Sequence, residues 1–177
     1  KWFENANEYD SKRLINVSVL GSIAYTTTLV VLNNYWYSDY AQTSFHFFND
    51  NKEWNQVDKA GHVFTSYYLG KTGIDLMKWS GVKNKKSIIY GGMLGSIFLT
   101  NIEILDGFSS KWGASPGDIA ANSLGSIIVI AQGWFWNEQK IQIKYSFNKP
   151  SYSSKTQART EQLFGDNLTE QLLKDYN

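Results

Sequence analysis

The longest uncharged apolar run, residues 14–32, restricts this chain more than any other feature does. Its 19 residues carry no charge, Lys12 and Arg13 precede it, and the aromatic sequence YWY follows at residues 35–37. About 20 apolar residues in a helix span the hydrocarbon core of a bilayer, and aromatic residues are enriched at its edges. The run therefore predicts a transmembrane helix.

Four apolar segments organise the chain and predict an all-α fold. We expect helices at residues 13–34, 58–80, 86–106 and 117–137. Running them alternately up and down gives the fold class that we predict, a four-helix up-and-down membrane-associated bundle. The alternative interpretation is that they are buried helices of a soluble bundle, because apolar runs near the length threshold are often core helices.

Small residues recur at four-residue spacing in the last two segments. Gly91 and Gly95 have this spacing in one segment, and Gly117, Ala121 and Gly125 have it in the other. Small residues so spaced let helices approach closely in lipid. We therefore expect these two segments to lie at tight helix interfaces.

The pattern changes after residue 137. Residues 141–147, IQIKYSF, alternate apolar and polar side chains, which predicts a short strand. A loop-rich stretch and an irregular tail follow. We therefore divide the chain into a membrane-associated four-helix domain, residues 1–137, and a polar C-terminal extension, residues 138–177. No signal-peptide pattern is visible at the start, so we expect the chain to begin at a mature or trimmed end.

Composition excludes several classes of protein. The formal net charge is only +1, so no basic surface dominates, and we expect no nucleic-acid partner. The sequence has no cysteine, which rules out a disulfide framework and a thiolate metal site within it. Aromatic residues make up 16% of the chain, with seven Trp, which suits helices anchored at membrane interfaces.

Charged residues segregate between the two ends of the expected bundle. The up-and-down order places Lys12, Arg13 and the lysines at 83, 85, 86, 140 and 144 at one end. The acidic residues at 39, 50, 53, 58, 106 and 118 fall at the other end. In an inner membrane the basic end is cytoplasmic, whereas in an outer membrane this rule has no force.

Polar pairs converge at the acidic end. Asp58 and His62 are four residues apart and share a helix face, as do Asp118 and Asn122. Lys59 lies beside the first pair, and Glu103 and Asp106 form a third pair on another segment. That third pair is three residues apart. Ionisable groups at membrane depth usually face the bundle interior or a wet cavity, so we expect one shared polar site.

Helix capping offers a simpler explanation for some of these acids. In SPGD, residues 115–118, Ser115 suits an N-cap, Pro116 suits the first turn, and the Asp118 carboxylate suits the helix dipole. Asp58 can likewise start the second helix. Capping does not explain Glu103 inside an apolar segment, nor the adjacent Lys59 and His62.

The motifs DKAGH and EILDGFSSKWGASPGDIAANSLGS resemble those of the YfiM-like proteins, a bacterial family of predicted periplasmic lipoproteins. HFFNDNKEWNQ further resembles Bacteroidetes members of that family. The pattern of Asp-Lys-x-x-His, a helix-borne Glu and Asp-x-x-x-Asn is also similar to that of the VanZ-like membrane proteins. The resemblance covers about residues 54–126. It implies a cell-envelope location, with the outer-membrane or periplasmic side favoured, and a four-helix membrane-associated fold, but no established reaction.

Two function classes remain open. In the first, the protein is an envelope membrane protein whose polar site binds or processes a lipid or glycan-lipid head group, so its partner is a membrane lipid. The candidate catalytic residues are His62, Asp58, Glu103 and Asp118, and the candidate ligand-binding residues are Lys59, Asp106 and Asn122. His62 would be the acid or base, Asp58 or Asp118 would orient it, and Lys59 would receive an anion such as phosphate.

A metal variant of this site would use His62, Glu103 and Asp118 as ligands. Only one histidine is available in the cluster, so we predict no metal and no cofactor. In the second function class the polar cluster is a structural network, and the protein is a non-catalytic subunit of an envelope protein complex. The other histidine, His46, lies in an aromatic loop, and we interpret it as interfacial.

Overall fold

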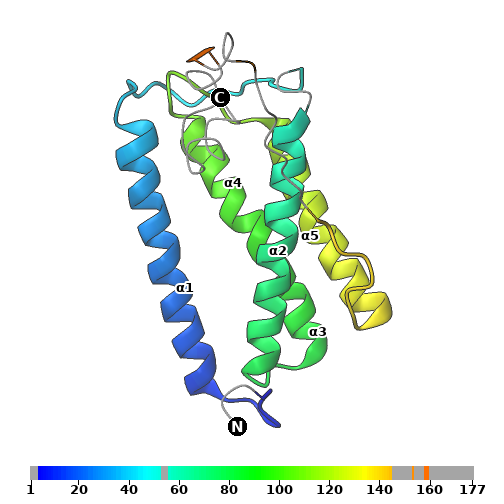
Figure 1. Ribbon diagram of the computed structural model, residues 1–177. Helices are drawn as coiled ribbons and strands as arrows, with labels where there is room; N and C mark the ends of the chain where they lie inside the picture. Colours follow the sequence, from blue (N-terminus) through cyan, green and yellow to red (C-terminus); the bar gives the residue numbers. More distant parts are fainter. Residues whose placement is uncertain (1–3, 53–55, 145–152, 154–157, 160–177) are drawn as a thin grey trace.

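Figure 1 shows the computed structural model of the protein, which describes residues 4–52, 56–144, 153 and 158–159. Its elements, in chain order, are α1 (Ser11–Leu32), η1 (Asn33–Tyr37), α2 (Val57–Trp79), α3 (Asn84–Lys86), η3 (Ser87–Gly91), α4 (Leu94–Asp106) and α5 (Pro116–Trp136). The described part of the chain contains no sheet. The all-α prediction is confirmed, and α3, η3 and α4 together form the third of the four predicted helices.

Local sequence explains where the first and last helices begin. The Asp10 carboxylate accepts hydrogen bonds from the backbone N–H groups of Lys12 and Arg13, and so caps α1. The Ser115 hydroxyl accepts from the N–H of Asp118, and Pro116 occupies the first turn of α5. The predicted Ser115 cap is therefore confirmed, and it fixes where α5 starts.

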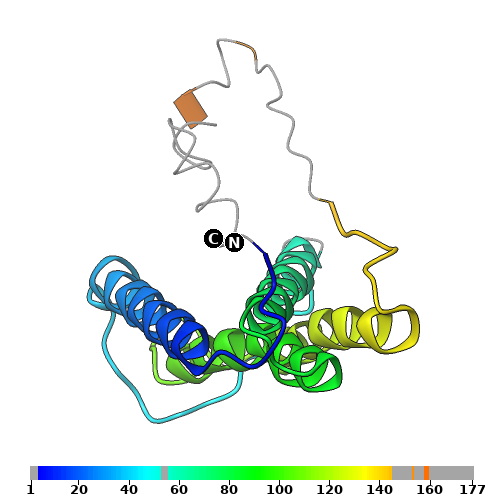
Figure 2. The same ribbon diagram turned by 90° about the horizontal axis from the view of Figure 1, so that it is seen from below.

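The helices alternate in direction, as an up-and-down bundle requires (Figure 1). Helices α2, α4 and α5 pack against one another, and the buried apolar cluster of Tyr67, Ile74, Ile88 and Val129 lies among α2, η3 and α5. In contrast, α1 stands to one side of this group in both views (Figures 1 and 2). No residue of α1 is buried.

Glycines set the close spacing of the packed helices. A Cβ added to Gly95 of α4 would collide with the Ser66 backbone carbonyl of α2. A Cβ added to Gly125 of α5 would collide with the Val63 carbonyl of the same helix, α2. The predicted close approach at these small residues is confirmed, with α2 as the neighbour that both helices share.

Apolar side chains cover much of the outside of the bundle. On α5, Leu124 is 50% exposed and Ile127 is 59% exposed, whereas Asn122 is completely buried. Among the described residues, three helical segments are long and apolar enough to cross a membrane, judged by length and composition alone. They are Ser11–Leu32, Asn84–Asp106 and Pro116–Trp136.

Two loops cover the acidic end of the bundle. The His46 backbone N–H donates to the Gly107 carbonyl, and the His46 carbonyl accepts from the Ala114 N–H. Isolated bridges also join Gln42 to Ser109 and Phe47 to Ala114. The loop between η1 and α2 is thereby held against the loop between α4 and α5, which brings both loops over the helix ends.

The prediction of a strand at residues 141–147 is not supported. Residues 141–144 form no strand, and residues 145–147 lie outside the described part of the chain. The backbone of Ile141 is satisfied by side chains instead: its N–H donates to Gln132 Oε1 at 2.6 Å, and its carbonyl accepts from Tyr67 at 3.0 Å. Ile143 similarly accepts from the Tyr68 hydroxyl at 2.7 Å. These bonds replace the ladder that a strand needs.

Candidate functional site

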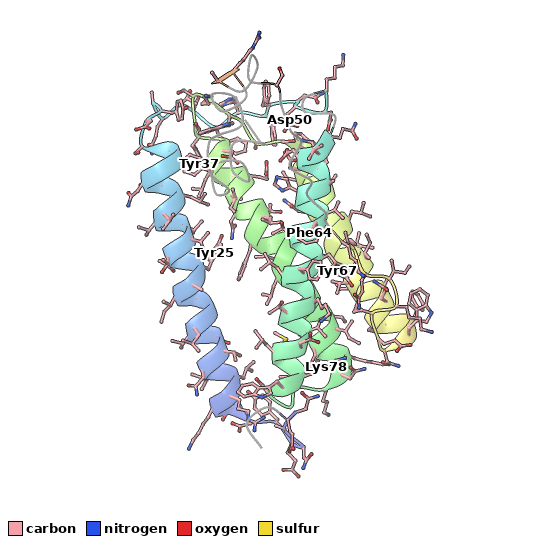
Figure 3. The ribbon with its side chains drawn as sticks, viewed as in Figure 1. Tyr25, Tyr37, Asp50, Phe64, Tyr67 and Lys78 are labelled. Carbon is pink, nitrogen blue, oxygen red and sulfur yellow. The ribbon has the colours of Figure 1, made fainter. Side chains whose placement is uncertain are left out.

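Lys59 lies at the centre of a group of carboxylates at the acidic end of the bundle. Its Nζ is 2.7 Å from Asp50 Oδ1, 2.8 Å from Asp118 Oδ1 and 3.1 Å from Asp58 Oδ2. These three acids come from the loop before α2, from α5 and from α2 itself. One ammonium group therefore joins three parts of the chain, and Figure 3 shows the end of the bundle at which Asp50 lies.

The second basic residue of the cluster is His62, one turn along α2. Its Nε2 is 3.5 Å from Asp58 Oδ1, 3.6 Å from Glu103 Oε1 and 3.9 Å from Asp118 Oδ1. The last two distances are too long for direct hydrogen bonds but short enough for bridging through one water. The structure thus brings together all four residues that the sequence offered as catalytic candidates.

Asn122 orients the His62 ring from the opposite side. His62 Nδ1 is 2.9 Å from Asn122 Oδ1, which is an acceptor, so Nδ1 carries the hydrogen in this pair. Nε2 then faces the carboxylates, and the protonated ring can donate from both nitrogens. The backbone carbonyl of Asn122 accepts from the Ser66 hydroxyl at 2.6 Å, which ties α5 to α2.

Glu103 and Asp118 are the most deeply buried acids, with side chains 4% and 5% exposed. Glu103 Oε2 accepts from the Ser115 backbone N–H at 3.0 Å, so an acid of α4 holds the start of α5. The Ser115 hydroxyl in turn donates to Asp50 Oδ1 at 2.7 Å. The cap of α5 is therefore part of the same polar network as Lys59.

Asp106 lies at the edge of this cluster and has a different partner. Its Oδ1 accepts from the Tyr37 hydroxyl at 2.6 Å. Burial, together with the nearby charge of Asp106, raises the pKa of Tyr37 well above its ordinary value. Tyr37 therefore stays protonated and acts as a donor to Asp106.

A cavity of about 530 Å³ adjoins this pair between α1 and α4. Tyr37 lines it together with Leu29, Val30 and Leu105, and its walls are mainly apolar. The volume lies within the range of about 300–1,000 Å³ that is common for small-molecule sites. Tyr37 thus lies both on an apolar cavity and on the polar cluster.

Sequence reasoning missed Asp50 and Tyr37 as members of the site. Tyr37 ends the π-helical turn η1, beyond the helix that the sequence predicted, and Asp50 lies in the loop before α2, where no helical periodicity indicates which side chains turn inward. Burial would raise the pKa of Asp50, but hydrogen bonds from Lys59 and Ser115 outweigh burial and hold that pKa below its usual range. The amino-acid sequence indicates Asp50 as a site residue only weakly, because Asp50 is one of several acids in that loop.

Three residues of the cluster could hold a metal ion. Asp58, His62 and Asp118 each offer one ligand atom, and these atoms lie within 4.8 Å of one another. In the present arrangement the Lys59 ammonium already contacts both of these carboxylates. A cation at this position would compete with Lys59, and the expectation of no metal stays a prediction.

The charge balance decides which ligands suit the site. Four carboxylates surround the centre, from Asp50, Asp58, Glu103 and Asp118, against the two basic side chains of Lys59 and His62. An anion brought to Lys59 would meet these acids at close range, which is unfavourable. Groups that donate hydrogen bonds, such as hydroxyl or ammonium groups, suit the site better than a bare phosphate does.

Residues 46–132 match the model of a family described as "Predicted periplasmic lipoprotein (DUF2279)". The match agrees with the resemblance to YfiM-like lipoproteins, supports a cell-envelope location and fits a protein of unknown reaction. It includes every residue of the cluster from Asp50 to Asn122 and begins after α1. No curated protein and no solved structure matches the chain.

Proposed function

We propose that this chain is an envelope membrane protein that binds the polar head group of a membrane lipid at the cluster around His62. The observation that carries the proposal is the convergence of three carboxylates from α2, α4 and α5 on His62 Nε2. Such an arrangement can accept hydrogen bonds from a hydroxyl or amine of a lipid or glycan-lipid head group. It can also move a proton to or from that group.

Membrane placement is supported by the inverted distribution of polarity in the packed helices. Ser66, Asn122, Ser126 and Gln132 are buried between helices, while Ile127 and its neighbours on the outer face are exposed. Burying polar and small groups while exposing large apolar ones is unfavourable in water but favourable in lipid. The same distribution disfavours the soluble-bundle interpretation.

The site is open enough for a ligand to reach it. The Asp58 side chain is 26% exposed and the Asp50 side chain is 19% exposed, whereas Asp118 lies deeper. Asn122 Nδ2 has no hydrogen-bond partner among the described residues, but Asn122 is completely buried behind the His62 ring, so a ligand could use this donor only if the ring moved. A head group entering past Asp58 would meet His62 first.

The apolar cavity between α1 and α4 offers a place for the acyl part of the same lipid. Tyr37 lines that cavity and donates to Asp106, which is one turn beyond Glu103 on α4. A lipid lying along α1 would therefore have its polar end close to the cluster. This arrangement fits a lipid substrate better than a water-soluble one.

The two histidines of the chain allow a direct test by nuclear magnetic resonance. We would label the histidine rings of the full chain in micelles and titrate phosphatidylethanolamine or a glycosyl diacylglycerol. The proposal expects the His62 signals to shift and the signals of His46, in the covering loop, to stay in place. Equal shifts at both rings, or none at His62, would reject head-group binding at the cluster.

One observation favours a second candidate function, a structural network in a non-catalytic subunit of an envelope complex. Lys59 already joins the loop, α2 and α5 through its three carboxylate contacts. The variant His62→Gln separates the two candidates, because glutamine keeps polarity and approximate size but cannot carry charge. Normal folding with lost retention of the head-group lipid, measured by native mass spectrometry because this variant has no His62 signal, supports the lipid site, whereas lost folding supports the network.

A further inference from the structure

A second cavity lies at the opposite, basic end of the molecule, where the N-terminal segment meets α1, α2 and α3. Its volume is about 420 Å³. The residues that line it are Tyr9, Leu14, Met77, Gly81, Val82, Lys83, Lys86 and Tyr90. We call it the basic-end cavity. It is separate from the polar cluster, because α2 runs the length of the bundle between the two (Figure 1).

The lining of the basic-end cavity combines two cations with an apolar wall. Lys83 and Lys86 are its charged residues, and no acidic residue lines it in the described part of the chain. Leu14 and Met77 contribute apolar surface from α1 and α2. The site therefore presents positive charge beside hydrocarbon, which is the complement of a lipid phosphate and its adjoining chain.

Two of the nearby acids are already engaged elsewhere, and a third, Glu8, adjoins Gly81 of the lining through its backbone carbonyl. Asp10 caps the first turn of α1 by accepting from Lys12 and Arg13, and its other oxygen lies 3.6 Å from Arg13 Nε. Asp75 of α2 is paired with Lys71 at 2.9 Å. None of these three acids lines the basic-end cavity, so its two lysines are not neutralised by another lining residue.

The position of the cavity suits a lipid that lies in the bilayer. It lies where two of the candidate spans begin, Ser11–Leu32 and Asn84–Asp106. Tyr9 and Tyr90 on its lining are 61% and 59% exposed, as aromatic residues at a membrane interface would be. Basic pockets between membrane-spanning helices are a recurring way of binding anionic lipid head groups.

We propose that the basic-end cavity binds the phosphate of an anionic membrane phospholipid through Lys83 and Lys86, with an acyl chain against Leu14 and Met77. The proposal rests on the membrane placement made above but not on any ligand at His62. The bound lipid fills the space between α1 and the packed helices at this end. It thereby helps to hold α1, which has no buried residues of its own.

The test is native mass spectrometry of the full chain in micelles that contain equal parts of phosphatidylglycerol and phosphatidylcholine. The wild-type chain should retain phosphatidylglycerol preferentially. The double variant Lys83→Gln/Lys86→Gln should weaken that preference by about fivefold for each lysine. Leu14→Trp, which fills the cavity without changing charge, should also displace the lipid.

Matched controls for the lysine variant lie at the same end of the bundle. Lys85 and Lys140 lie over the rings of Trp134 and Trp136 and do not line the cavity. Their double variant, Lys85→Gln/Lys140→Gln, removes the same charge and should keep the preference. Leu20→Trp, at a position of α1 that is 65% exposed, is the control for the added ring.

Several outcomes would overturn the proposal. Equal losses in the two lysine double variants would mean that only net charge matters. Retention in both the Lys83→Gln/Lys86→Gln and Leu14→Trp variants, with unchanged thermal unfolding, would reject the site. Displacement of the lipid by inorganic phosphate at equal concentration would reject the acyl contact.

The proposed function can fail independently of this inference. If the chain resists carbonate extraction from membranes but retains no phosphatidylglycerol, the cavity proposal is wrong and membrane placement stands. If carbonate releases the chain, both proposals are wrong. A chain that binds phosphatidylglycerol but shows no response at His62 would support only the basic-end cavity.

Discussion

Helices α1 and α5 have similar length and apolar character but opposite positions in the molecule. Both qualify as candidate membrane spans, yet α1 buries no residue whereas α5 buries eight. The buried face of α5 carries small and polar residues, among them Asp118, Asn122 and Gly125. The comparison teaches that apolar content predicts a helix, while small and polar residues decide which helices pack together.

The packed helices and α1 also differ in their relation to the family match and in their contacts. The packed group of α2, α4 and α5 carries the cluster, and the segment matched by the family model covers this group except for the last turn of α5. Helix α1 begins and ends before that segment and touches the group at few places, such as the stack of Tyr25 on Phe98. The predictions below test this division, from the largest expected effect to the smallest.

The first prediction compares two glycines. Gly95→Val should destabilise the packed group by about 3 kcal/mol, because its side chain has no space against the Ser66 carbonyl. Gly21→Val on α1 should have almost no effect, since nothing lies within 4 Å of its Cβ position. Unfolding in mixed micelles by sodium dodecyl sulfate measures both. Equal losses would show that α1 is packed as tightly as the other helices.

The second prediction concerns Lys59. Lys59→Met should cost about 2 kcal/mol, because it leaves the Asp50, Asp58 and Asp118 carboxylates without their shared cation. Lys71→Met on the same helix removes an exposed pair and should cost under about 0.5 kcal/mol. The same unfolding assay compares the two variants. A Lys59 variant as stable as the Lys71 variant would mean that the cluster does not hold the helices together.

The third prediction tests the contact that holds α1. Tyr25 stacks on Phe98 with ring centroids 4.4 Å apart, so Tyr25→Ala should cost about 1 kcal/mol. The loss should appear as freer motion of α1, measured by the distance distribution between spin labels on α1 and α4. The packed group itself should unfold as in the wild type. Unchanged distances would indicate that other contacts hold α1.

The fourth and smallest effect is the pH dependence of the packed group. The pKa of Asp50 is lowered in the folded protein, so the stability that it contributes is present above its unfolded pKa and is lost as the pH falls. Thermal stability should decline below about pH 4. Asp50→Asn should make this decline shallower. A decline of the same slope in the variant would exclude Asp50 as its source.

The sequence alone predicted much of the fold and the composition of the site. Apolar runs predicted all four helices, and the observed ends lie within two residues of the predicted ones, apart from the π-helical turns that extend α1. Helical spacing also brought His62, Asp118 and Asn122 to one end. The predicted strand is not supported over its described residues, 141–144, because alternation was taken as evidence for pairing, whereas the Ile141 backbone bonds to the Gln132 side chain.

The amino-acid sequence by itself therefore determined the helices, their glycine contacts and the end of the bundle at which the acids gather. These features depend on local periodicity and on the alternating direction of successive helices. Only the tertiary structure decided that Lys59 would be held by three carboxylates, and that Asp50 from the loop before α2 and Tyr37 from the end of η1 would join the site. It also decided that α1 would lie apart. Periodicity does not encode which neighbour a loop side chain meets, since that depends on how the helix ends and loops pack together.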